Sequence, residues 1–471
     1  MKKGLSLAGS LLASALIVTS LGACSKIKND ENTLNIVCLN KGYGDTWIKN
    51  LKEIWEKNNP NYKINLQATS TAASTISKNI NSKSNTDDLY ISVGNEWKTF
   101  AARGSFLALD DFIEEEVDGI KIKDKVNDEY KESIYYTNSN NETHVYRLPW
   151  TSGVGGIYYN AKMFEANNWS VPTTYEELLT LIETIKNANI PVKNSETNVV
   201  KPFVYTGKNS DYFDYAVFTW WSQLATSSEI KEFLQYENAD CFDYTITNKA
   251  YSKLYDATKL WYNIFSNNDN YVSGSGDKTN HQAQQDFLNG NAAMMFNSDW
   301  VYSEMSKYTS DGTFPEDFSL KIMKTPIAPN AISKNTSYIV GEDQFIAIPK
   351  TSTKADLAKS FIKLMISNQG MENFTNTAYG LMAYKWDLSS YKTDNEYLTS
   401  LIDYRSNLNN TFTNYSSNPM YLSGIIDIWS TGSTRPFSGL LTTVKSVETS
   451  FETIKKQATT NWETWRKQAG L

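Results

Sequence analysis

The chain has 471 residues, of which 40% are hydrophobic and 21% are charged, and its formal net charge is −7. This length leaves room for two or three domains, and this composition supports a packed core and excludes a wholly disordered chain. The acidic balance lacks the basic surface that displaces counterions from phosphates, so we expect no nucleic-acid partner.

The N-terminus has the layout of a secretion signal. Two lysines follow Met1, and an apolar run over 5–18 comes next, broken by Gly and Ser and short for a membrane span. Small residues directly before Cys24 then fit a cleavage point. We predict a signal peptide over 1–23 and a flexible polar tether over 24–33. An uncleaved anchor, with Cys24 as an ordinary thiol, is the alternative.

The residues after the tether alternate between strand and helix patterns. Strands are predicted over 34–39, 62–66 and 88–93, and a helix over 47–58. Such alternation indicates a largely parallel sheet with helices on its faces, and ligands bind beyond the carboxyl ends of its strands. The loops that we expect at a cleft are therefore 40–47, 94–97 and 148–152.

Two cysteines remain besides Cys24. Cys38 lies within an apolar run, which favours a buried free thiol. A disulfide between Cys38 and Cys241 is the alternative in an oxidising compartment, although their spacing carries no signature.

The later part of the chain continues the same alternation. Thr173 or Thr174 can cap a helix that has Glu176 and Glu177 in its first turn. Further helices are predicted over 212–224, 282–288, 357–366 and 437–468, and further strands over 144–150, 157–159, 291–297 and 345–348.

Three passages of this part carry a family resemblance. They are GIYYNAKMF with VPTTYEEL at 156–178, GNAAMMFNSDW at 290–300, and FIAIPK with the amphipathic segment after it at 345–370. In this order and spacing, behind LGAC at 21–24 (which resembles a bacterial lipobox), the chain resembles extracellular solute-binding protein family 1, the maltose-binding-like receptors of carbohydrate ABC importers. It departs from the family pattern at Tyr175, where Trp is more usual, and at Ser298-Asp299, which replaces a Gly-containing turn.

The resemblance implies an α/β fold of two lobes, similar to periplasmic binding proteins. Each lobe would be a mostly parallel sheet flanked by helices, and three hinge crossings would join the lobes. The crossings are expected near 150–153, 338–341 and 380–384. The N-lobe would then comprise 34–150 with 342–381, and the C-lobe 151–340 with 383–471.

A sugar presents hydroxyls around its rim and C–H faces above and below, so its pocket needs stacking rings and hydrogen-bonding side chains. Trp300 is the leading candidate ring, and its alternative role is core packing at a helix start. The predicted ligand-binding residues are Lys41, Tyr43, Asp45, Asn95, Glu96, Trp150, Asp211, Tyr212, Asn297, Asp299, Trp300 and Asp343. The alternatives are a solvated turn for the first three, a helix cap for Asn95 and hinge packing for Trp150.

Other conspicuous residues favour structural roles. Trp220 and Trp221 lie in the middle of a predicted helix among apolar neighbours, so a core role is expected for at least one of them. For Arg435 a surface salt bridge is favoured over contact with a ligand.

The resemblance implies the substrate-binding lipoprotein of an ABC importer. Such a protein captures a mono- or oligosaccharide by closure of its lobes and delivers it to permease subunits. We expect it as a monomer at the extracytoplasmic face of a bacterial cell membrane, held only by acyl chains such as palmitate on Cys24, with no cofactor, metal or catalytic residue. The alternative is an extracellular glycosidase with paired carboxylates, which 52 Asp and Glu residues leave open.

Overall fold

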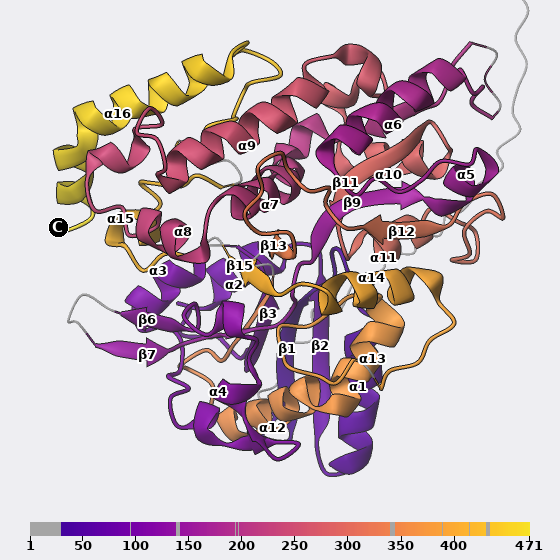
Figure 1. Cartoon of the computed structure of the whole chain (residues 1–471). Coiled ribbons are helices and arrows are strands. Elements are labelled where there is room, and N and C mark those ends of the chain that lie inside the picture. The colour runs from indigo at the N-terminus through magenta and orange to yellow at the C-terminus, as the bar shows by residue number, and fades with distance from the viewer. Residues whose placement is uncertain are drawn as a thin grey trace, which may run out of the picture.

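Two α/β lobes lie one above the other in the computed structural model (Figure 1). The structure describes residues 30–94, 96–137, 142–193, 195, 197–339, 344–388, 390–413, 415–429 and 434–471. Within the described part, no helix has both the length and the apolar composition that crossing a bilayer requires.

The first lobe is built on a five-stranded sheet in the order β2-β1-β3-β14-β8. Its strands are β1 (Thr33–Leu39), β2 (Lys63–Thr69), β3 (Leu89–Ser92), β8 (Leu148–Pro149) and β14 (Phe345–Ala347). Its helices are α1 (Thr46–Asn58), α2 (Ala72–Asn79), α3 (Glu96–Ala102), α4 (Ile122–Lys125), α12 (Ala355–Ile366) and α13 (Asn368–Ala378). Two hairpins, β4 (Glu116–Val117) with β5 (Ile120–Lys121) and β6 (Tyr135–Thr137) with β7 (Thr143–Val145), and the 3-10 turns η1 (Phe112–Glu114) and η2 (Asp128–Tyr130) complete this lobe.

The second lobe is built on a four-stranded sheet in the order β10-β11-β9-β12. Its strands are β9 (Gly155–Asn160), β10 (Lys201–Val204), β11 (Ala292–Ser298) and β12 (Leu320–Met323). Its α-helices are α5 (Ala161–Ala166), α6 (Tyr175–Ala188), α7 (Asp214–Leu224), α8 (Ser227–Phe233), α9 (Ala250–Phe265), α10 (Asn280–Leu288), α11 (Val301–Ser306), α14 (Glu396–Ser406), α15 (Pro419–Leu422) and α16 (Val447–Gln468). Its 3-10 turns are η3 (Gly207–Phe213), η4 (Ala239–Phe242), η5 (Asn268–Asn270) and η6 (Ser275–Asp277), and a separate parallel pair is formed by β13 (Thr336–Tyr338) and β15 (Asn410–Phe412).

Each main sheet is mostly parallel, as predicted, with one strand reversed. In the first lobe, β14 runs antiparallel to both of its neighbours. In the second lobe, β9 does the same. These are the strands that the chain forms directly after it has crossed from the other lobe. A strand that starts at the junction must run away from it, so the carboxyl ends of the other strands face the junction, where ligands bind in such sheets.

The connections between the lobes lie side by side. The backbone N–H of Trp150 donates to the carbonyl of Gln344 at 2.7 Å, and that of Ser152 donates to the carbonyl of Leu381 at 2.9 Å. The N–H of Ala383 donates back to the carbonyl of Trp150 at 3.0 Å. Segments near all three expected crossings are thus bonded to one another into a small ladder.

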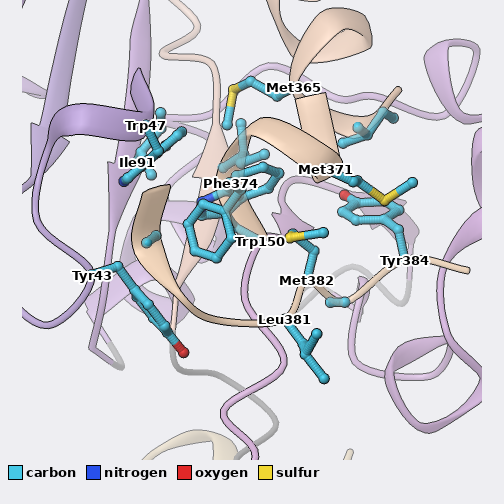
Figure 2. Close-up of a cluster of buried hydrophobic side chains, with 14 of the residues drawn as sticks. Tyr43, Trp47, Ile91, Trp150, Met365, Met371, Phe374, Leu381, Met382 and Tyr384 are labelled. Atoms are coloured by element: carbon cyan, nitrogen blue, oxygen red, sulfur yellow. The ribbon is translucent and has the colours of Figure 1, made fainter. Parts of the chain in front are cut away.

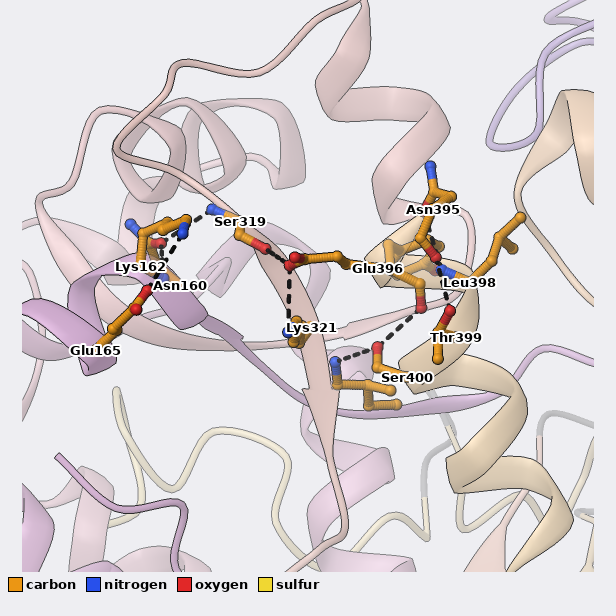
Figure 3. A network of polar contacts seen from close by, with 12 residues as sticks. Asn160, Lys162, Glu165, Ser319, Lys321, Asn395, Glu396, Leu398, Thr399 and Ser400 are labelled. Atoms are coloured by element: carbon orange, nitrogen blue, oxygen red, sulfur yellow. Dashed lines mark hydrogen bonds and ion pairs between the residues drawn. The ribbon is translucent and has the colours of Figure 1, made fainter. Parts of the chain in front are cut away.

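After the third connection the chain joins the second lobe through α14. Glu396 accepts a hydrogen bond from the Ser319 hydroxyl at 2.9 Å and pairs with the Lys321 ammonium at 3.2 Å (Figure 3). One turn further, the Ser400 hydroxyl accepts from the backbone N–H of Ile322 at 3.3 Å. These contacts fix α14 along the outer strand β12.

The expected strand over 144–150 is two separate strands, which corrects the sequence analysis. The chain leaves the β6–β7 hairpin after Val145 and enters the main sheet only at Leu148. Between them, the buried Arg147 places its guanidinium 3.7 Å from the centre of the Trp97 ring. Val145 pairs with Tyr135 in the hairpin and Leu148 pairs with Ile346 in the main sheet, so the chain passes from one sheet to the other between them.

The expected helix over 437–468 is also shorter than predicted. It begins at Val447, because Gly439 adopts a left-handed φ of 74° and the segment up to Ser446 forms turns. The Ser446 hydroxyl then accepts a hydrogen bond from the backbone N–H of Thr449 at 3.3 Å, which caps the helix.

The two cysteines of the described part do not form a disulfide. Cys38 is buried in β1 of the first lobe, and Cys241 lies in η4 of the second. Burial raises the pKa of both thiols above its usual value, and nearby Asp45 and Asp240 raise it further. The free-thiol interpretation of Cys38 is confirmed.

Candidate functional site

A pocket of about 790 Å³ opens between the lobes, at the carboxyl ends of strands from both sheets. Of the predicted ligand-binding residues it contains Lys41, Tyr43, Tyr212 and Trp300. Its volume lies within the range of about 300–1,000 Å³ that small-molecule sites occupy. The other lining residues with hydrogen-bonding side chains are Asn40, Ser70, Asn209, Asn280, His281, Glu304, Lys307, Tyr308 and Gln344.

A second pocket, of about 930 Å³, lies on the outer side of the second lobe next to α5. None of the described residues that line it is aromatic. A sugar needs flat rings against its C–H faces, so the pocket between the lobes is the better candidate.

Trp300 stands at the start of α11, directly after the carboxyl end of β11, and is half-buried. Its ring packs nearly perpendicular to the Tyr43 ring, with centroids 6.1 Å apart, and its indole N–H donates to the Tyr212 hydroxyl at 3.2 Å. Gly42 of the first lobe adopts a left-handed φ of 69°, and a Cβ there would be in ordinary contact with the Trp300 Cβ, at 3.4 Å. Trp300 therefore has both of the roles that the sequence presented as alternatives: it packs on its neighbours and it lines the pocket.

Tyr212 reaches the pocket from η3 rather than from the regular helix expected over 212–224. The α-helical part begins only at Asp214, because Asn209 has non-helical backbone angles within η3. Both Asn209 and Tyr212 line the pocket from this irregular turn.

Asp299 does not line the pocket, because its side chain is fully buried beneath Trp300. Its carboxylate accepts hydrogen bonds from the Tyr43 hydroxyl at 2.6 Å and from the backbone N–H of Leu381 at 3.0 Å. Its carbonyl accepts from the Tyr397 hydroxyl at 2.6 Å. The residue thereby links the end of β11 to the first lobe and to the third crossing, and it positions Trp300.

Asn297 and Trp150 are also fully buried and outside the pocket lining. The side-chain oxygen of Asn297 accepts from the backbone N–H of Ser298 at 2.8 Å. The Trp150 ring lies 5.1 Å from both the Trp47 and the Phe374 rings, in the aromatic cluster drawn in Figure 2. In this structure Trp150 packs at the hinge.

Two acidic candidates lie beside the pocket and not in its lining. Asp45 forms an ion pair with Lys49 at 3.0 Å. Burial raises the pKa of Asp211 above its usual value, while its own backbone N–H and the Arg435 guanidinium partly oppose that rise. Direct contact of either residue with a ligand stays a prediction.

Four predicted residues are not placed. Asn95, Asp343 and the lipidation candidate Cys24 lie outside the described residues, as does the side chain of Glu96, whose backbone begins α3.

The prediction of a surface salt bridge for Arg435 is wrong, because its ion pair is buried. The side chain is buried, and its guanidinium donates to the Asp214 carboxylate at 2.6 Å and to the Ser210 carbonyl at 2.8 Å. It also stacks 3.9 Å over the centre of the Phe437 ring. Because Ser210 belongs to η3, this ion pair holds the turn that carries Tyr212.

Glu304 and Lys307 also line the pocket and were not predicted from the sequence. Together with Trp300 they stand at positions i, i+4 and i+7, the spacing of a single helix face. Once Trp300 is proposed as a ligand-binding residue, that periodicity would have indicated Glu304 and Lys307 as well. His281 had no such signal, because it comes from α10; it hydrogen-bonds to Tyr308, which follows α11.

Comparison with known proteins agrees with this architecture. A family model described as bacterial extracellular solute-binding protein matches residues 40–372, more than half of the chain. The chain belongs to this family. A search of curated proteins found no match.

Solved structures share the fold of this solute-binding protein at low sequence identity. RafE from Streptococcus pneumoniae is 15% identical, with a TM-score of 0.63 over 90% of this chain and 96% of RafE. A substrate-binding protein from Listeria monocytogenes, solved with cycloalternan, is 15% identical, with a TM-score of 0.62 over 91% and 99% of the two chains. RafE has also been solved with raffinose, where the TM-score is 0.61.

The described residues that line this solute-binding protein's pocket are suited to binding a solute. Rings and hydrogen-bonding groups from both lobes surround the space. A glycosidase of the usual type needs two carboxylates on either side of the bond it cleaves. Among the described lining residues Glu304 is the one carboxylate, and it accepts a hydrogen bond from the Gln284 amide at 2.7 Å.

Proposed function

We propose that this solute-binding protein captures a carbohydrate between its lobes and delivers it to the permease of an ABC importer. The supporting observation is the pocket itself: aromatic rings from both lobes stand at strand ends among hydrogen-bonding side chains. This is the combination that a sugar's apolar faces and polar rim require.

Closure of the lobes would tell the permease that a ligand is bound, because the permease would recognise the closed arrangement. A ligand that contacts Lys41 and Tyr43 on the first lobe and Tyr212 and Trp300 on the second stabilises the closed arrangement over the open one. It shifts that equilibrium only by its difference in affinity for the two arrangements. The bonded ladder of crossings supplies the hinge about which the lobes turn.

We further propose that the mature protein is a lipoprotein held to the membrane through Cys24. Its polar tether of about ten residues would lift the body off the bilayer. Metabolic labelling with palmitate should mark the native chain and not the Cys24→Ser variant. Equal labelling of both would refute the anchor.

A thermal-shift screen against mono- and oligosaccharides tests the ligand class. A ligand that binds only the folded state raises the melting temperature, by an amount that grows with its concentration over its dissociation constant. Hits should lose affinity in the Trp300→Ala variant and keep it in Trp386→Ala. Trp386 is also half-buried, and it packs on Tyr391 at 5.3 Å, outside the pocket lining. The absence of any carbohydrate hit, or release of cleavage products, would contradict the proposal.

A further inference from the structure

Two lysines line the pocket, one from each lobe. Lys41 lies on the loop after β1, and Lys307 is the C-cap that follows α11. Both side chains are exposed, and neither forms an ion pair with any residue that the structure describes. Two lysines that are close in sequence to lining residues differ in this respect: Lys49 is paired with Asp45 at 3.0 Å and Lys278 with Asp286 at 2.9 Å.

The carboxylate among the described lining residues is that of Glu304, and it forms no ion pair with either lysine. Glu304 is 7% exposed, and its carboxylate accepts from the Gln284 amide at 2.7 Å. The described lining therefore carries two lysines against one carboxylate, in a chain whose formal net charge is −7. Among the described lining residues lysines thus outnumber carboxylates, whereas acidic residues outnumber basic ones in the chain as a whole.

The two ammonium groups belong to facing walls. The Lys307 Nζ lies 4.0 Å from where a Cβ on Gly44 would stand, so this lysine of the second lobe reaches the loop of the first. Lys41 lies on the same loop of the first lobe, three positions before Gly44, and also lines the pocket. The two lysines therefore approach the same pocket from opposite lobes.

We propose that the solute is an anionic carbohydrate, whose carboxylate or phosphate group lies between Lys41 and Lys307 while a sugar ring packs on Trp300. Because the two lysines line the pocket from opposite lobes, an anion bound between them is attracted to both lobes and favours their closure. A neutral sugar gains neither attraction. This inference rests on the proposed carbohydrate-binding function and specifies its substrate class.

Calorimetric titration with matched ligands tests the inference. The neutral ligands are galactose, glucose and their short oligomers, and the acidic partners are galacturonate, glucuronate, the corresponding oligouronates and glucose 6-phosphate. We expect an acidic partner to bind at least tenfold more tightly than its neutral counterpart. The oligouronates and the sugar phosphate distinguish a carboxylate site from a phosphate site. Raising NaCl from 50 to 500 mM should lower the affinity for the acidic ligand several-fold and leave the affinity for neutral ligands unchanged.

Variants assign the effect to the two lysines. Lys307→Met and Lys41→Met should each lower affinity for the acidic ligand about tenfold, reduce its salt dependence, and leave the melting temperature unchanged because both side chains are exposed. The control is Lys162→Met, which removes the same charge from α5, where Lys162 pairs with Glu165 at 3.2 Å. It should behave as wild type.

The outcomes separate the two proposals. Neutral sugars that bind as tightly as their acidic partners, or Lys307→Met and Lys41→Met proteins that bind the acid as wild type does, would overturn the anionic solute and leave carbohydrate capture standing. A failure of both series to bind would refute carbohydrate capture, and this inference with it.

Discussion

Replacing Trp300 by Ala removes contacts on both sides of the pocket at once. The ring packs against Tyr43 and Tyr212, each with centroids 6.1 Å away, and such aromatic pairs contribute about 0.5–1.5 kcal/mol each. The indole hydrogen bond to Tyr212 contributes about 1 kcal/mol more. We expect the free energy of unfolding to fall by about 2–4 kcal/mol. Because the unfolding entropy of a chain of this length is about 1 kcal/mol per K, the melting temperature should then fall by about 2–4 °C.

The same change should weaken ligand binding by more than its effect on folding explains. A buried Trp at the centre of a binding site typically costs at least about 2 kcal/mol of binding free energy when truncated, which is about 30-fold in affinity. Denaturation followed by circular dichroism measures the first effect. Calorimetric titration well below the melting temperature measures the second on folded protein.

A second substitution separates packing from ligand stacking. Trp300→Phe keeps a ring against Tyr43 and loses the indole donor, so it should recover more than half of the lost stability. If Trp300→Ala melts at the same temperature as wild type, the contacts of this ring do not stabilise the folded protein. If it binds the best carbohydrate of the screen with unchanged affinity, Trp300 is not part of the site.

Three further predictions follow from buried contacts. Arg435→Met leaves the Asp214 carboxylate buried without its main cation and should cost about 3–5 kcal/mol in urea unfolding. Burial raises the pKa of Asp211, so this carboxyl binds its proton more tightly in the folded state than in the unfolded state. The folded state therefore loses stability as pH rises above about 4. Asp211→Asn should melt at a higher temperature than wild type at pH 7, and the difference should decrease towards pH 4. Gly155→Ala places a Cβ 1.8 Å from the Tyr215 ring and should cost about 1–3 kcal/mol in thermal unfolding.

Each of these predictions has a contrasting measurement. The double variant Arg435→Met with Asp214→Leu should regain most of the stability, since no buried charge remains, and equal loss in both would contradict the ion-pair explanation. A constant gap between Asp211→Asn and wild type from pH 4 to 7 would exclude titration of this carboxyl. Gly276→Ala, whose Cβ would meet nothing nearer than the Tyr205 hydroxyl at 3.6 Å, should melt as wild type.

Local rules predicted much of the secondary structure. Thr174 and Glu177 form the expected capping box at the start of α6, each side chain bonded to the other's backbone N–H. Trp220 and Trp221 are both fully buried, and their indole N–H groups donate to the carbonyls of Pro326 and Ala250 at 2.9 and 2.7 Å. Such features depend on residues within one turn or on the apolar periodicity of one helix, which the sequence displays directly.

The site was predictable only in part. Lys41, Tyr43, Tyr212 and Trp300 line the pocket because they follow strand ends or begin a helix, a position that the order of elements indicates. That rule gives the place of a residue and not the direction of its side chain. Asp299 follows the same strand as Trp300, yet its carboxylate turns inward to Tyr43.

The sequence by itself determined the alternation of elements, the two-lobed fold through its family motifs, and the loops at which the lobes face each other. Only the tertiary structure decided which polar side chains support the pocket and which line it. Tyr43 and Asp299 are 256 positions apart, and Arg435 and Asp214 are 221 apart. Contacts at such separations depend on how whole elements pack, because no local periodicity or spacing encodes a partner so distant along the chain.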